Sequence, residues 1–264
     1  MVHHSPIEYN IVPSMREELD FFEEFLKPDS GVSWESPLAF LIKRMPFAKS
    51  WGDACLDACG GFSINLNFFW FVEFPTNIVQ RTLKHLADNR HNNLISINVL
   101  EFFTIIINYC AALTALKFGN YTSDPHPVLL NMTDNTSTHS WTNHTCKNSR
   151  LEKLLAKFCC YLLMDSPLGI NSKWLSTTDN VIADDISRIK KLNATSSKHF
   201  SFEYSLLQQK YPQLNNCHFF QPSQDLLSAL WGILLHGKLP SLKEVRKLKQ
   251  AGLGKLITLS GAQA

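Results

Sequence analysis

Short apolar runs in the first third of the chain predict strands. Residues 51–56, 62–66 and 68–74 are rich in aromatic and β-branched residues, and 59–61 reads as a turn because it ends in two glycines. Three short strands in succession predict an antiparallel meander.

Further along, the pattern alternates between helical spacing and short apolar runs. The predicted elements are a helix or extended connection at 76–87, a helix at 95–116, a strand at 127–132, a polar stretch at 134–149, a helix at 150–164, a strand at 169–175 and a helix at 181–189. This order predicts an α/β protein, in which a mixed sheet of three antiparallel strands followed by parallel strands is flanked by helices.

Both ends of the chain carry apolar residues at helical spacing. The helices expected there are 15–26, 36–44, 204–209, 226–235 and 241–250. We therefore expect three parts: a helical connecting segment at 1–47, the sheet domain at 48–190 and a helical extension at 191–264.

The segment 94–116 is apolar over a length close to that of a membrane span. Glu101 lies inside it, together with the polar residues Asn98, Thr104 and Asn108. A carboxylate in the interior of a bilayer is costly, so we interpret the segment as a buried helix with one polar, functional face. The alternative, a membrane-anchored protein, predicts that this helix lies exposed on the surface and is not packed under a sheet.

Composition narrows the class of protein. The chain has 264 residues, 45% hydrophobic and 18% charged, which is typical of globular proteins. A net charge of +2 gives no argument for nucleic-acid binding from bulk charge. The seven cysteines form no Cys-x-x-Cys block, and residues 1–8 lack the apolar run of a secretory signal. We therefore expect a reduced intracellular protein, in the cytoplasm or the nucleus.

Four acidic residues occur where the predicted strands and helices would meet: Asp53, Glu101, Asp134 and Asp184. Separately, three of them have ordinary explanations, as a strand-end residue, a helix N-cap and an exposed helix charge. Glu101 is harder to explain, because a carboxylate in an apolar helix is costly unless it is paired or metal-bound. As a set they predict a cluster at one sheet edge that holds divalent metal against a phosphodiester.

The residues after Asp134 are a second candidate for substrate contact. Asn135, Thr136 and Ser137 carry amide and hydroxyl groups that could contact a nucleic-acid backbone. The alternative is the ordinary polarity of a helix start.

Four short motifs surround the carboxylates: Asp53-Ala54-Cys55 with Gly60-Gly61, Leu100-Glu101, Thr133-Asp134-Asn135, and Asn180-x-x-Ala183-Asp184-x-Ile186-Ser187-Arg188. Together they resemble the ribonuclease H domains of retroelement reverse transcriptases, over residues 48–190. The last motif is the most specific. The segments Phe220-Gln221-Pro222-Ser223 and Leu253-Gly254-Lys255-Leu256 resemble the region located after ribonuclease H in DIRS-like elements, which carry a tyrosine recombinase.

The resemblance implies a ribonuclease H-like fold and a metal-dependent endonuclease that cleaves the RNA strand of RNA–DNA hybrids. It implies two Mg²⁺ ions, with Mn²⁺ as an alternative. Asp53 would bridge both ions, Glu101 and Asp134 would hold one, and Asp184 the other. The implied partners are the RNA–DNA hybrid and a separate or upstream reverse transcriptase domain, without a membrane. The alternative function is a catalytically inactive remnant, or a nucleic-acid-binding or connecting module of a retrotransposon polyprotein.

The chain departs from the family pattern in several places. Cys55 replaces the usual serine, and no Tyr-x-Asp-Asp polymerase motif is present. Asp57 is an alternative to Asp53, and Asp185 is an alternative to Asp184. No histidine-bearing loop precedes Asp184, so the sequence gives no support for histidine-assisted product release.

Overall fold

The computed structural model divides the chain into two units, Met1–Lys43 and Arg44–Ala264. It describes residues 13–27, 45–87, 95–118, 127–143, 150–189 and 200–258. In the first unit, helix α1 (Pro13–Leu26) confirms the predicted helix at 15–26. The helix predicted at 36–44 lies outside the described residues.

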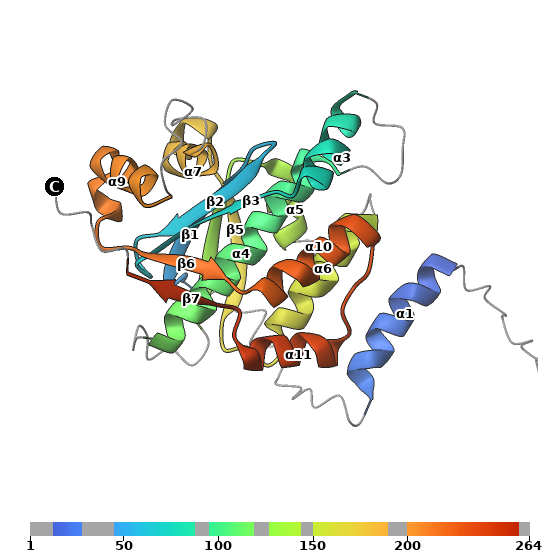
Figure 1. Ribbon diagram of the computed structural model, residues 1–264. Helices are drawn as coiled ribbons and strands as arrows, with labels where there is room; N and C mark the ends of the chain where they lie inside the picture. The colour runs from blue at the N-terminus through green and yellow to red at the C-terminus, as the bar shows by residue number, and fades with distance from the viewer. Residues whose placement is uncertain are drawn as a thin grey trace, which may run out of the picture. The chain divides into compact units, whose positions relative to one another are not determined.

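The second unit is built on a mixed sheet of seven strands, in the order β5-β4-β1-β2-β3-β6-β7 (Figure 1). The strands are β1 (Ala48–Ala54), β2 (Ala58–Ser63), β3 (Phe68–Glu73), β4 (Val128–Thr133), β5 (Gly169–Trp174), β6 (His218–Pro222) and β7 (Gly254–Ile257). Strands β1, β2 and β3 form the antiparallel meander, and β4 and β5 continue the sheet in parallel from β1. The prediction of an α/β protein with a mixed sheet is confirmed.

Helices cover both faces of the sheet (Figure 1). They are α3 (Thr76–Ala87), α4 (Ile97–Phe118), α5 (Thr136–Asn143), α6 (Arg150–Leu163), α7 (Val181–Ser187), α9 (Phe200–Lys210), α10 (Gln224–His236) and α11 (Leu242–Ala251), with short 3₁₀ turns η2 (Thr177–Asp179) and η3 (Pro212–Leu214). Helix α4 packs on the face to which Gly61 points, and α7 packs on the face to which Gly60 points. Successive residues of a strand point to opposite faces, so the two helices enclose β2 from both sides.

The turn predicted at 59–61 is wrong. Both glycines lie inside β2, where Gly60 pairs with Asp53 and Gly61 pairs with Gly52. The β1–β2 connection instead covers residues 55–57, closed by a hydrogen bond from the Cys55 backbone N–H to the Ala58 carbonyl (2.9 Å). These glycines serve close helix packing and not chain reversal, a tertiary requirement that local sequence does not reveal.

Helix α4 is the central buried helix, as predicted. By length and composition alone, Ile97–Lys117 could cross a membrane, but 94% of its most apolar stretch is buried inside the protein. The Trp70 indole N–H donates to Asn108 Oδ1 (2.7 Å), and the Thr104 hydroxyl donates to the Glu101 carbonyl (2.7 Å). The helix therefore packs under the sheet, opposite to the surface exposure that the membrane-anchored alternative requires.

The C-terminal segment contains more than helices, so the prediction of a purely helical extension is wrong on this point. Helices α9, α10 and α11 confirm the three predicted helices. Strand β6 pairs in parallel with β3, and β7 pairs antiparallel with β6, so both strands extend the sheet beyond the meander. The sequence pattern missed them because they span only five and four residues and contain Pro222 and Gly254, which are typical of loops.

Candidate metal centre

Asp53 lies in β1, and its side chain is almost completely buried. Its Oδ2 accepts a hydrogen bond from the Ser187 hydroxyl (2.7 Å) at the end of α7. Burial raises the pKa of Asp53 from 3.8 to about 6; the Ser187 hydrogen bond lowers it, and the charges of Asp184 and Asp134 raise it. Near neutral pH the carboxylate is therefore charged at a free-energy cost that a cation would offset.

Glu101 lies near the start of α4 and reaches towards β1. Its Oε1 accepts a hydrogen bond from the Ala54 backbone N–H (3.3 Å). Its Oε2 is buried and has no hydrogen-bond partner among the described residues. Burial raises the pKa of Glu101 well above its usual range, and the charges of Asp53 and Asp134 raise it further.

Asp134 directly follows β4, and its carboxylate is not needed to start the next helix. Asn135 is the residue that caps α5, because its Oδ1 accepts from the Thr138 backbone N–H (2.9 Å). The Trp174 indole N–H donates to the Asp134 backbone carbonyl (2.9 Å), which ties this residue to the end of β5. The half-buried carboxylate of Asp134 is therefore available to the site.

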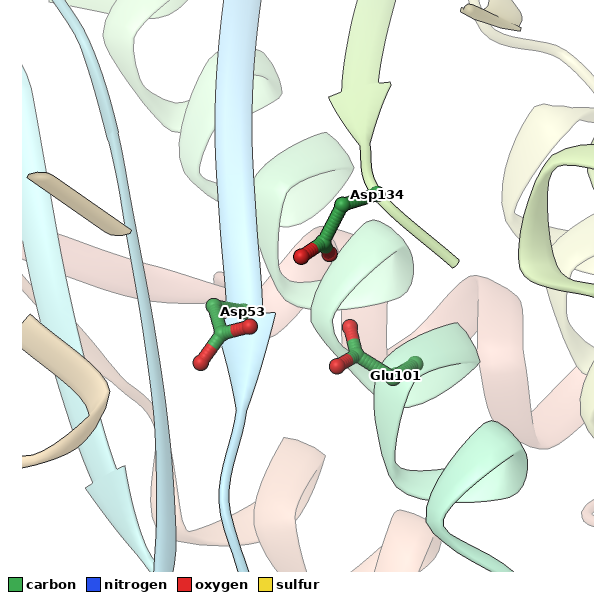
Figure 2. Close-up of side chains that lie close together, drawn as sticks. All are labelled: Asp53, Glu101 and Asp134. Atoms are coloured by element: carbon green, nitrogen blue, oxygen red, sulfur yellow. The ribbon is translucent and has the colours of Figure 1, made fainter. Parts of the chain in front are cut away.

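The three carboxylates converge. One ligand oxygen from each of Asp53, Glu101 and Asp134 lies within 4.8 Å of the others. Figure 2 shows the three side chains directed into one space between the ends of β1 and β4 and the first turns of α4. They come from sequence positions up to 81 residues apart, so the fold and not local sequence assembles the group.

Two glycines allow the close packing that this convergence requires. A Cβ at Gly52 would lie 2.9 Å from Thr104 Oγ1, and a Cβ at Gly60 would lie 2.3 Å from Ile186 Cγ2. Distances under 3.0 Å are too short for a real Cβ, so larger residues would push α4 and α7 away from β1 and β2. Gly52 thereby lets α4 bring Glu101 to the end of β1, and Gly60 lets α7 bring Ser187 to Asp53.

The donor set of this site fits a divalent metal ion. Three carboxylates in a largely buried space repel each other, and the partnerless Glu101 Oε2 leaves one acceptor unsatisfied among the described residues. A cation between them would neutralise the repulsion and use that acceptor. Asp53, Glu101 and Asp134 are the residues that could hold it.

Asp184 lies near this group but outside it. Its Oδ1 accepts from Arg188 Nε (2.7 Å) and pairs with Arg188 Nη2 (2.6 Å) on the next turn of α7. Its charge nevertheless contributes to the raised pKa values of Asp53 and Glu101, so the carboxylate acts on the site electrostatically. The structure thus brings three of the four predicted carboxylates together and leaves the fourth paired with an arginine beside them.

The two alternative carboxylates lie elsewhere. Asp57 is exposed in the turn between β1 and β2. Asp185 forms an ion pair with Lys210 (2.5 Å) and accepts a hydrogen bond from the Tyr211 hydroxyl (2.5 Å), both in or next to α9. In the structure Asp53 belongs to the group and Asp57 does not, and Asp185 connects α7 to α9.

The three residues predicted to contact nucleic acid differ in how far contacts within the fold already use their side chains. Asn135 is half-buried and held within the fold, because it caps α5 and its Nδ2 donates to Asn98 Oδ1 (2.8 Å). Thr136 is exposed and Ser137 half-buried at the first turn of α5. All three residues are thus at least partly exposed, and Thr136 is the most exposed of them.

Sequence reasoning assigned no role to three residues at the site. Asn180 is buried, and its Nδ2 donates to the Gly52 carbonyl (3.1 Å) and to Asp134 Oδ1 (3.4 Å). Ser187 holds Asp53, and Trp174 holds the Asp134 backbone. Asn180 and Ser187 lie inside the motif around Asp184, so the motif could have indicated that they belong to the site. No feature of the sequence indicated Trp174.

A pocket of about 390 Å³ lies beside the group. Its lining includes Cys55, Ser187 and Arg188, which lie next to Asp53 and Asp184. Arg188 is exposed and carries the positive charge on this side. Ser187, which donates to Asp53, thus lines this pocket, whereas the three carboxylates of the group do not.

Comparison of the chain with models of known protein families, with curated proteins and with solved structures finds no match. The geometry of the site and the sequence motifs are therefore the grounds for a functional assignment.

Proposed function

We propose that this protein is a Mg²⁺-dependent nuclease of the ribonuclease H class, which hydrolyses the RNA strand of RNA–DNA hybrids. The observation that carries the proposal is the convergence of Asp53, Glu101 and Asp134 within 4.8 Å, with Glu101 Oε2 buried and unsatisfied among the described residues. Oxygen-only donors of this kind suit Mg²⁺, with Mn²⁺ as the alternative ion.

The topology supports the proposal. The order β3-β2-β1-β4-β5, with an antiparallel meander followed by two parallel strands, is compatible with a ribonuclease H-like sheet. The three carboxylates come from β1, from helix α4, which precedes β4, and from the residue directly after β4, in the order of the motifs in the sequence. The spatial group therefore contains three of the four carboxylates that the family motifs select, with Asp184 beside it.

The chain's own residues define how the site would work. A bound Mg²⁺ would supply an activated water and neutralise charge on the phosphodiester. Asp53, Glu101 and Asp134 would hold it, and Ser187 and the backbone of Ala54 would fix two of these carboxylates by hydrogen bonds. No side-chain base is required.

One observation favours the alternative, an inactive nucleic-acid-binding module. Asp184, which would hold a second ion, is paired with Arg188. In a catalytic site Asp184 must in addition reach a metal ion, through Oδ2, which these contacts do not use, or after the ion pair opens, whereas in a remnant it needs no contact besides Arg188. The two functions therefore differ in the behaviour of Asp184.

The test is cleavage of a 5′-labelled RNA strand in an RNA–DNA hybrid, with RNA–RNA and DNA–DNA duplexes of the same sequence as controls. We expect cleavage of the hybrid in Mg²⁺, none in EDTA, and none of either control duplex. Hybrid binding without cleavage in Mg²⁺ or Mn²⁺ would establish the inactive module instead.

A further inference from the structure

Trp174 is a large aromatic side chain at the edge of the metal centre. It is the last residue of β5 and pairs with Thr133, the residue before Asp134. Its side chain is 47% exposed, whereas Trp70, the largest side chain in the core, is fully buried. An exposed tryptophan thus stands one strand away from a metal-binding carboxylate.

The ring of Trp174 is held in place. Its indole N–H donates to the backbone carbonyl of Asp134 (2.9 Å). This bond satisfies the polar atom of the ring, so the surface that remains exposed is apolar and aromatic. The same bond couples the orientation of the ring to the residue that carries a metal-binding carboxylate.

We propose that Trp174 is a substrate-binding residue, whose ring stacks on a nucleotide ring of the bound nucleic acid next to the scissile phosphate. Bases and sugars offer flat or apolar faces, and stacking on aromatic side chains tolerates any sequence. A ring fixed in advance loses little conformational freedom when it binds. This inference rests on the proposed function, because it places a nucleic acid at the carboxylate group.

Two variants separate stacking from the hydrogen bond. Trp174→Phe keeps an aromatic ring and removes the N–H donor, whereas Trp174→Ala removes both. Leu86→Ala is the matched control, because it removes an exposed apolar side chain (66% exposed) from α3. All are measured in an Asp134→Asn background, in which the hybrid stays intact.

The measurement is the dissociation constant for a labelled hybrid, from fluorescence anisotropy. We expect Trp174→Ala to weaken binding about tenfold or more, as for the loss of one stacked base. Trp174→Phe should stay within about threefold of its parent, and Leu86→Ala should equal it. An unchanged dissociation constant in Trp174→Ala overturns the inference, and so does equal weakening by Phe and Ala, which would assign the effect to the hydrogen bond.

A spectroscopic readout covers the case in which Trp174→Ala does not fold. The emission of Trp174 is obtained as the difference between the parent and Trp174→Phe. We expect hybrid binding to quench this emission and to protect it from iodide; emission that does not respond overturns the inference.

If the unmutated protein cleaves hybrids while Trp174→Ala binds them normally, only this inference fails. If the unmutated protein neither binds nor cleaves hybrids, the proposed function fails with it.

Discussion

The hydroxyl of Ser187 donates a 2.7 Å hydrogen bond to Asp53, a residue 134 positions earlier in the chain. The same hydroxyl lies 2.8 Å from the carbonyl of Asp184. Ser187 thereby links the carboxylate of β1 to the helix that carries the fourth acidic residue. The positions of Asp53 and Asp184 thus depend on Ser187, a residue of the sequence motif for which the sequence predicted no role.

Replacing Ser187 should weaken metal binding without unfolding the protein. Ser187→Ala removes the hydrogen bond that orients Asp53 and lowers its pKa, so Asp53 becomes a poorer ligand near neutral pH. Loss of such a supporting contact costs about 10- to 100-fold in metal affinity. Calorimetric titration with Mn²⁺ measures the change. Ser176→Ala, at a half-buried serine before η2 whose hydroxyl donates to Asp179, is the control and should bind Mn²⁺ as the unmutated protein does.

Stability of the metal-free protein should depend on the ionisation of Asp53. Its pKa is 3.8 ordinarily and about 6 in the folded protein, so the folded state favours the protonated form. The destabilising contribution is absent below pH 3.8, grows as the pH rises to about 6 and is complete above it, at about 3 kcal/mol. The raised pKa of Glu101 acts in the same direction.

Urea denaturation in EDTA between pH 4.5 and 7.5 measures this effect. Asp53→Asn should gain stability relative to the unmutated protein as the pH rises through this window, whereas Asp57→Asn should show no such gain. Added Mg²⁺ should raise the stability of the unmutated protein above pH 6. A stability difference between Asp53→Asn and the unmutated protein that stays constant across the window would contradict the account.

Close packing at Gly60 should be essential for the stability of the fold and for metal binding. In Gly60→Ala the new Cβ would meet Ile186 Cγ2 at 2.3 Å, so α7 must move and the Asp53–Ser187 hydrogen bond must lengthen. We expect a loss of about 1–3 kcal/mol in the free energy of unfolding, as for overpacking, together with weaker metal binding. Gly232→Ala, in helix α10, is the matched control, because the atom nearest to its new Cβ, the Lys238 carbonyl oxygen, would lie 3.9 Å away. This control should be neutral or gain up to about 1 kcal/mol; equal losses in both variants would contradict a packing role for Gly60.

Asp184 should act differently from the three grouped carboxylates. In Asp184→Asn, a charge that raises the pKa of Asp53 and Glu101 is removed, while the group itself stays intact. We expect tight binding of one Mn²⁺ ion to persist within about threefold, whereas Glu101→Gln should lose it. Calorimetry of both variants gives stoichiometry and affinity. Complete loss of binding in Asp184→Asn would place this residue among the primary ligands.

Much of the fold can be predicted from local sequence, because apolar spacing reports burial directly. Glu101 illustrates this: a carboxylate within a continuous apolar helix is costly unless it is paired or metal-bound, and the structure places it in the acidic group. The antiparallel meander is also predictable from short apolar runs, although the second strand covers Ala58–Ser63 and not 62–66.

The features that the sequence could not reveal depend on contacts between distant segments. Gly60 and Gly61 read as a turn, although their small size serves the approach of α7 and α4. Strands β6 and β7 are too short to show a period, and only the pairing of β6 with β3 and of β7 with β6 makes them strands. The Asp184–Arg188 pair and the Trp174–Asp134 bond depend on side-chain orientation, which residue spacing does not determine.

The proposed function requires that the Asp53–Glu101–Asp134 group catalyse metal-dependent hydrolysis of RNA in a hybrid. The most direct measurement compares hybrid cleavage in Mg²⁺ by Asp134→Asn and by Asp185→Asn, whose carboxylate instead contacts α9. We predict that Asp134→Asn abolishes cleavage while its circular dichroism spectrum stays that of the unmutated protein and its thermal unfolding stays cooperative, and that Asp185→Asn retains cleavage. Cleavage by Asp134→Asn at the rate of the unmutated protein would contradict the proposed function.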